Sequence, residues 1–314
     1  MTVRTASRTG RGPDQRILGA AVGCLVLLSA CTGTTTAEPE ATPAATSDAF
    51  TLASLPHLDG STASIPLLSL ILQKLADVPK AQADNVETST TPTAYNNIAC
   101  GPANPKSSVV IAGEPAQAIK DGIAGCAQLE YHPIGRDALV FLVNESNPVG
   151  SLTTAQLADI YSGKTTNWKA VGGADQKIVA YQQSKTAGSQ ALLDKFVMAD
   201  AQLAPAPAQI VLGEKGTMTE GLANYDNADN AIGYSVFYYA KELYAAPDTK
   251  LLAVGGVAPS AETIADGTYP YVNDFYAVIR ADEPEASPAR RVVAWLESLD
   301  GQIAIASAGY VANK

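Results

Sequence analysis

Two apolar stretches mark strands that are buried on both faces. Residues Ala138–Val143 form a continuous apolar run with β-branched and aromatic side chains, and Ala231–Phe237 is a second candidate of this kind. Strands that are covered on both faces have unbroken hydrophobic runs in place of alternating ones. We therefore predict two buried strands, at each of which the chain crosses between two α/β lobes.

A helix with clear start and stop signals follows the first of these strands. Thr153 and Gln156 have the spacing of a capping box, in which each side chain bonds to the backbone of the other residue. Leu157 and Ile160 begin an apolar stripe, and Gly163 stands where a glycine commonly ends a helix. The pattern predicts a short helix between Thr153 and Gly163.

The other periodic segments alternate between the two element types. Pro66 suits the first turn of a helix whose apolar face follows it, and Pro288 suits the start of a closing helical region at Ser287–Ile305. Further helices are expected near Ala116–Cys126 and Leu192–Val197, and further strands at Ser107–Ala112, Lys177–Tyr181 and Phe275–Ile279. This alternation predicts an α/β protein with a mixed central sheet in each lobe and a two-strand hinge.

The positions of the two crossings divide the chain into lobes. We expect lobe one to combine residues 48–143 with 237–314, and lobe two to contain residues 144–236. A hydrophobic content of 46% is enough for a sizeable core in a chain of 314 residues.

The N-terminal residues have the pattern of an export signal. Four arginines between Arg4 and Arg16 precede an apolar run, Ile17–Leu28, which is too short to span a bilayer. The run ends in Leu-Ser-Ala-Cys31, which resembles a bacterial lipobox, so we expect residues 1–30 to be a lipoprotein signal peptide and Cys31 to carry lipid. The alternative is an ordinary secretory signal that happens to end near a cysteine.

A low-complexity stretch follows Cys31. Residues Thr32–Ser47 are rich in Thr, Ala and Pro and contain too few apolar side chains to build a core. We expect residues 31–47 to be a flexible tether between a membrane anchor and the folded body.

Charge and histidine content exclude several functions. The formal net charge is −10, and because residues 1–30 carry a surplus of three positive charges, the remainder carries −13. Nucleic-acid binding requires a basic surface, so we expect no such partner. The chain has only two histidines, with no ligand-like spacing, and we expect neither a metal nor another cofactor.

Two cysteines remain after the signal and the lipidation site are set aside. In an exported chain Cys100 and Cys126 are expected to form a disulfide. The alternative is a pair of separate buried thiols.

Two glycine- and hydroxyl-containing turns precede helices and could hold an anion. Ser61 and Thr62 lie at the start of the first predicted helix, and Gly188 and Ser189 lie at the start of a later one. The amides and the dipole at a helix N-terminus favour negative charge. The alternative for Ser61 and Thr62 is that their hydroxyls only cap the helix.

Taken together, these segments resemble the PstS-type phosphate-binding proteins of bacterial ABC transporters, which have the type 2 periplasmic-binding-protein fold. The likeness runs from about Leu58 to Val311. It is carried by motifs at Asp59–Ala63 (DGSTA), Pro133–Asn144, Asn147–Val149, Leu152–Trp168, Val171–Gly173, Ala231–Ser235 and Gly301–Tyr310. The resemblance implies a monomeric binding protein that works with ABC permease subunits.

The resemblance also implies a ligand site, although several of its positions are changed here. Ser61 and Thr62 match the family's first hydroxyl pair, and Gly188 and Ser189 match its glycine turn. The family's arginine is replaced by Gln183. The Ser before the glycine is Ala187, and the Thr after Gln190 is Ala191. The family's Asp is not found near strand 109–112, where Ser107 and Ser108 stand.

These changes predict a weaker anion site. The set Ser61, Thr62, Ser108, Gln183, Gly188 and Ser189 would offer hydroxyls and amides without the bidentate charge of an arginine. Lys185 could partly replace that charge as a point charge. We expect phosphate or a related oxyanion as ligand; the alternatives are another polar ligand or a non-transporting surface or sensor protein. We expect no enzyme, because the chain has no GxSxG, HExxH or dinucleotide-binding motif.

Overall fold

The structure is a computed structural model of the chain, and it describes residues 50–101, 108–199, 201–206, 211–212, 228–244 and 248–313. The predicted signal peptide, Cys31 and the tether lie outside the described residues. The described residues all belong to one compact unit. Within these ranges, no helix is both long and apolar enough to cross a bilayer.

One mixed sheet of eight strands organises the described part of the chain. Its main path contains, in spatial order, β1 (His57–Gly60), β2 (Ser108–Gly113), β11 (Val272–Arg280), β3 (Leu129–Asn144), β8 (Ala231–Val236) and β5 (Val179–Ala180). β12 (Val311–Ala312) and β9 (Thr249–Leu251) also pair with β3. β1 with β2 and β5 with β8 are parallel pairs, whereas β11 and β3 run antiparallel to their neighbours. The predicted mixed α/β fold is confirmed.

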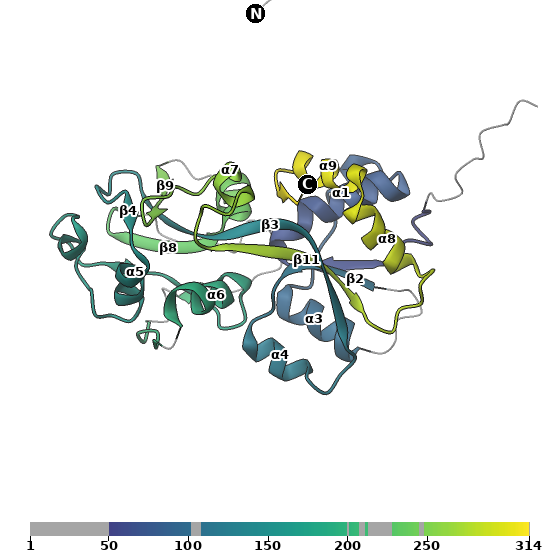
Figure 1. Cartoon of the computed structure of the whole chain (residues 1–314), viewed down its shortest axis with the longest axis horizontal. Helices are drawn as coiled ribbons and strands as arrows, with labels where there is room; N and C mark the ends of the chain where they lie inside the picture. The colour runs from purple at the N-terminus through teal and green to yellow at the C-terminus, as the bar shows by residue number, and fades with distance from the viewer. Residues whose placement is uncertain are drawn as a thin grey trace, which may run out of the picture. The chain divides into compact units, whose positions relative to one another are not determined.

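The strand β3 connects the two halves of this sheet. Its first part pairs with β11, from Leu129 opposite Arg280 to Ala138 opposite Val272, and the two strands run side by side in Figure 1. Its last part, from Leu139, pairs with β8. Both apolar runs predicted as buried strands are strands, and they are direct neighbours.

Two large groups of buried side chains lie along the two parts of β3. Cluster one includes Leu67, Ile111, Ile134, Phe275 and Val292. The helices α1 (Ile65–Ala76) and α8 (Pro288–Glu297) contribute side chains to it. Cluster two includes Phe141, Tyr161, Trp168, Leu193 and Tyr234. The helices α5 (Thr154–Tyr161) and α6 (Gly188–Leu193) contribute side chains to it. Each cluster therefore combines sheet and helix surfaces, as in a layered α/β protein.

The packing of residues 249–271 bears on one predicted lobe boundary. The sequence analysis placed all of residues 237–314 in lobe one, yet Leu252, Val254 and Ile264 pack in cluster two. The reason is local pairing: β9 is hydrogen-bonded to the end of β3, and β10 (Ala253–Val254) pairs with β4 (Ser151–Leu152). The division into lobes stays a prediction, and this packing favours counting residues 249–271 with the second lobe.

The ends of the helices follow local signals. The capping box between Thr153 and Gln156 is present, as predicted. The closing region at 287–305 is two helices, α8 and α9 (Leu299–Ser307), because Ser298 ends the first and its hydroxyl accepts a hydrogen bond from Gly301 N at 3.2 Å to start the second. The remaining elements are α2 (Lys80–Ala83), α3 (Thr91–Cys100), α4 (Gln117–Ile123), β6 (Gln182–Gln183), β7 (Val211–Leu212), α7 (Ala261–Ala265), 3₁₀ turns at Thr62–Ser64 and Trp168–Val171, and π-helical turns at Asp194–Met198 and Tyr239–Tyr244.

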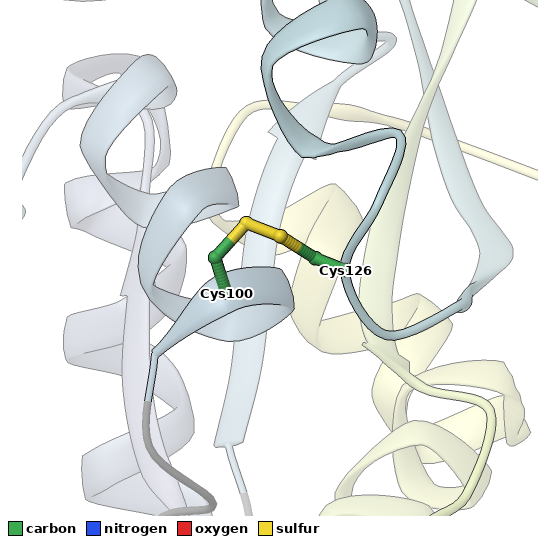
Figure 2. Close-up of a disulfide and its surroundings, with 2 residues drawn as sticks. All are labelled: Cys100 and Cys126. Atoms are coloured by element: carbon green, nitrogen blue, oxygen red, sulfur yellow. A yellow bond between two sulfur atoms is a disulfide. The ribbon is translucent and has the colours of Figure 1, made fainter.

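A disulfide joins Cys100 to Cys126, as the sequence analysis expected (Figure 2). Cys100 is the last residue of α3, and Cys126 follows the end of α4, so the bond links the ends of two helices. The Cα atoms are 5.0 Å apart, within the usual range for a disulfide.

Candidate functional site

A pocket of about 160 Å³ lies where the two clusters approach each other. Ile111, Phe275 and Tyr310 of cluster one and Leu192 of cluster two are among the residues that line it. The volume is well above the roughly 10–15 Å³ that a single buried water needs. The pocket can therefore hold a small ligand.

Five of the six predicted ligand residues line this pocket: Ser61, Thr62, Gln183, Gly188 and Ser189. The turns at Ser61–Thr62 and Gly188–Ser189, 127 residues apart in the sequence (188 − 61), are thereby brought to one cavity. The sixth residue, Ser108, is not among the lining residues. It lies at the start of β2, opposite His57, whereas the pocket is at the other end of that strand, at Gly113. Ser108 therefore lies apart from the pocket at which the other five residues meet.

Close packing of β1 on β2 fixes the first turn. A Cβ atom on Gly60 would lie 2.1 Å from the carbonyl oxygen of Ile111, so only glycine fits there. Ser61 N donates to the same carbonyl at 3.1 Å, and the chain then enters the turn that leads to α1. The Ser61 hydroxyl makes no capping hydrogen bond. The capping alternative therefore does not describe Ser61, whose side chain lines the pocket.

A third hydroxyl-rich turn, which the sequence analysis missed, also borders the pocket. Thr90 and Thr91 precede and begin α3, and Thr90 has a φ of 75°, a strained value for a β-branched residue. The buried carboxylate of Asp59 holds this turn, because its Oδ1 accepts from Ser89 N at 2.8 Å and from Gly60 N at 2.7 Å, and its Oδ2 accepts from the Ser89 hydroxyl. Pro92 in the first turn of the helix was the signal available in the sequence.

A chain of hydrogen bonds positions the Gln183 side of the pocket. The Gln183 backbone N–H donates to the Tyr234 hydroxyl at 2.9 Å, and the Gln183 side-chain amide donates to the Tyr234 carbonyl at 3.3 Å. The Tyr234 hydroxyl donates to Gln190, whose amide donates to Asp194 at 2.8 Å. Burial raises the pKa of Tyr234, so this hydroxyl stays protonated and can donate. The network holds the start of α6 against β8.

A carboxylate lies one residue after the end of β2, at Glu114. It lines the pocket, and its two oxygens accept from Lys120 Nζ at 2.7 Å and Lys195 Nζ at 2.9 Å. The Lys120 hydrogen bond is the largest cause that lowers the pKa of Glu114; Lys195 lowers it too, and burial opposes both. Glu114 is therefore ionised at neutral pH. The family resemblance predicted an Asp near this strand, and a Glu just beyond it was not among the predicted site residues.

A second acid, Asp137, also borders the pocket. Its Oδ1 accepts from its neighbour Ala138 N at 2.8 Å and from Tyr238 N at 3.1 Å. Burial raises the pKa of Asp137 to about 7, although backbone donors oppose this change. Ala138 belongs to cluster two and Tyr238 to cluster one. The Asp137 carboxylate therefore links two chain segments, each of which passes from one cluster to the other.

The pocket has carboxylates and hydroxyls on its walls but no lining cation among the described residues. No Lys or Arg is part of the described lining, and Lys185, the predicted partial substitute for the arginine, is exposed and is not among the lining residues. Tyr310 adds an aromatic wall: its ring stacks on Tyr238 with centroids 3.6 Å apart, and its hydroxyl donates to the Ala63 carbonyl. The arrangement can bind a small oxyanion through hydroxyls and amides, and an ionised carboxylate in it can accept a hydrogen bond from a proton on the ligand.

Comparison with known proteins identifies the family. The PBP superfamily domain model matches residues 38–298. The phosphate-binding protein PstS of Bacillus subtilis is 27% identical over 214 residues, which cover 68% of this chain and 66% of the relative. PstS of Borreliella burgdorferi is 25% identical over 183 residues, or 57% of this chain and 64% of the relative. The matches thus span slightly less than two thirds of these relatives.

The fold has close counterparts among solved structures. A putative phosphate ABC transporter substrate-binding protein with bound phosphate from Clostridium perfringens superposes with a TM-score of 0.63 at 21% identity, covering 82% of this chain and 99% of that one. A likeness at this identity shows the fold alone. With the sequence matches and the domain model, it establishes that this chain belongs to the PBP superfamily and is similar to its PstS-type phosphate-binding proteins.

Proposed function

We propose that this protein is the extracytoplasmic solute-binding component of an ABC importer and captures phosphate in the pocket described above. One observation carries the proposal: in a chain similar to PstS proteins, the turns at Ser61–Thr62 and Gly188–Ser189 line the same cavity. Their hydroxyls and amides are suitable donors to the oxygens of a phosphate. The role is binding and release, with no chemical step.

The acids give the pocket a preference among oxyanions. An ionised carboxylate such as Glu114 can accept a hydrogen bond from the proton of hydrogen phosphate but is repelled by sulfate, which carries no proton at neutral pH. We propose that Glu114 takes this part in place of Ser108. Because Gln183 stands where the family has an arginine, affinity should be lower than in relatives that keep the guanidinium.

Calorimetry with the purified full-length chain tests the function. We expect phosphate to bind with a dissociation constant of roughly micromolar to millimolar, because the lost charge-assisted bonds are each worth about 1.5–3 kcal/mol, and sulfate to bind more weakly. Ser61→Ala should weaken phosphate binding about tenfold, the equivalent of about 1.4 kcal/mol. Ser108→Ala is the matched control outside the pocket and should leave affinity unchanged. Tight binding of a neutral solute with no response to phosphate would reject the proposal.

The site of action follows from the N-terminal pattern. We propose that lipid on Cys31 anchors the protein to the outer face of the bacterial cell membrane and that residues 32–47 are the tether. Cys31→Ala should shift the protein from the membrane fraction to the soluble fraction of fractionated cells. A variant that stays with the membrane would contradict the anchor. ABC permease subunits are the proposed partners, and the protein is proposed to act as a monomer.

A further inference from the structure

The ammonium group of Lys195 reaches across the edge of the pocket. Lys195 follows α6, in a turn whose Val197 and Met198 pack in cluster two. Its Nζ lies 2.9 Å from Glu114 Oε2 and 3.1 Å from Asn273 Oδ1. Both partners line the pocket: Glu114 comes just after β2, and Asn273 belongs to β11. Lys195 therefore joins the helix that begins at Gly188 to the strands on the opposite side of the cavity.

A second lysine binds the same carboxylate without crossing the pocket. Lys120 donates to Glu114 Oε1 at 2.7 Å from α4, only six residues further along the chain. The two lysines are comparably exposed, at 40% for the Lys120 side chain and 48% for that of Lys195. They differ mainly in where they are attached, because one is local to Glu114 and the other comes from the far wall.

Neutralising Glu114 matters because the pocket would otherwise repel an anion. Three acids, Glu114, Asp137 and Asp274, line it, and no lining Lys or Arg is found among the described residues. A cation held 2.9 Å from Glu114 offsets this charge at the place where a phosphate would meet it. A second contact also joins α6 to the opposite side of the cavity. Ala191 of α6 packs against the buried group that includes Tyr95 and Val110.

We propose that Lys195 is an affinity-determining residue of the phosphate site: it supplies, through Glu114, the positive charge that Gln183 no longer provides, and it holds the Gly188–Ser189 turn closed over the ligand. The inference rests on the proposed function. Because the closing contact must break before the ligand leaves, Lys195 should act mainly on the rate of phosphate dissociation.

The test compares Lys195→Gln with Lys120→Gln in the full-length chain, using phosphate as the probe in calorimetry and stopped-flow displacement. Lys195→Gln should raise the dissociation constant about fivefold, the equivalent of about 1 kcal/mol for a half-exposed ion pair, with most of the change in the dissociation rate. Lys120→Gln also removes a charge from Glu114 but breaks no contact with the α6 side of the pocket, so it should raise the dissociation constant less than Lys195→Gln does. Lys195→Arg should restore most of the affinity, and raising the salt concentration should narrow the gap between wild type and Lys195→Gln.

The outcomes distinguish a failure of this inference from a failure of the proposed function. If wild type binds phosphate and the two glutamine variants behave alike, or if Lys195→Gln changes only the thermal midpoint, Lys195 has no special place in the site. If wild type does not bind phosphate, the proposed function itself fails. Loss of the Lys195→Gln effect in a Glu114→Gln background would support the coupling, whereas an unchanged effect there would overturn it.

Discussion

At the scale of single residues, Asp137 makes the stability of the protein depend on pH. Its pKa is raised by burial to about 7, whereas an Asp in an unfolded chain titrates near 3.9. Between these values the folded state holds a proton that the unfolded state has lost. Stability contributed by this group is therefore complete below about pH 4, falls as pH rises, and is lost above about pH 7.

Replacing the carboxyl group by an amide isolates this contribution. Asp137→Asn keeps an oxygen that can accept from Tyr238 N and removes the charge. We expect the variant to be more stable than wild type at pH 8, by a few kcal/mol at most, and nearly equal to it at pH 4.5. Urea unfolding at both pH values measures this. A difference between variant and wild type that is the same at pH 4.5 and pH 8 would contradict the account.

Residues of the site differed in how far the sequence could predict them. Ser61, Thr62, Gly188 and Ser189 lie at or next to the starts of helical segments, where the local pattern suggested an anion site and the family resemblance singled them out. Thr90 enters the pocket through the contact between Asp59 and Ser89, which are 30 residues apart, and no local pattern reports such a contact.

At the scale of elements, packing explains why the motif at Gly301–Tyr310 begins with a glycine and a glutamine. A Cβ atom on Gly301 would lie 2.0 Å from the Trp295 carbonyl oxygen, so glycine lets α9 start directly against the end of α8. The buried Gln302 amide then donates to the Ile134 carbonyl at 3.0 Å and to the Leu296 carbonyl at 2.8 Å. The predicted helical region at Ser287–Ile305 did not include this break, which the Ser298 cap produces within an otherwise helical pattern.

The disulfide should stabilise the pair of helices that it links. It closes a loop with a sequence separation of 26, for which the chain-entropy model gives about 3 kcal/mol. We expect the double variant Cys100→Ser/Cys126→Ser to lose about this free energy of unfolding in urea. Reductant should destabilise wild type by a similar amount and leave the double variant unchanged. Equal stability of wild type and double variant would show that the bond contributes nothing.

At the scale of the whole molecule, the sequence predicted the class of fold but not every connection. The alternation of helical and strand patterns predicted a mixed α/β protein, and the two buried strands are neighbours in one sheet. The short strands β9 and β10 have two or three residues each and no clear pattern of their own. Their pairing with β3 and β4 is decided by tertiary contacts, which the sequence pattern does not report.

The central claim is that phosphate occupies the pocket lined by Gln183 and is weakly held because an arginine is missing there. The most direct measurement is the phosphate affinity of Gln183→Arg compared with wild type and with Gln182→Arg. Gln182 is the neighbouring residue of β6; its side chain donates to the Ala204 carbonyl at 2.9 Å, and it does not line the pocket. The control therefore adds the same charge one residue away.

Two charge-assisted bonds from a guanidinium are worth about 3–6 kcal/mol before the loss of the Gln183 contact with Tyr234 is counted. We therefore predict that Gln183→Arg tightens phosphate binding at least about tenfold and up to roughly 10⁴-fold in calorimetry, while Gln182→Arg changes it by less than about threefold. Equal affinities for wild type and Gln183→Arg, or an equal gain in both variants, would contradict the placement of phosphate in this pocket.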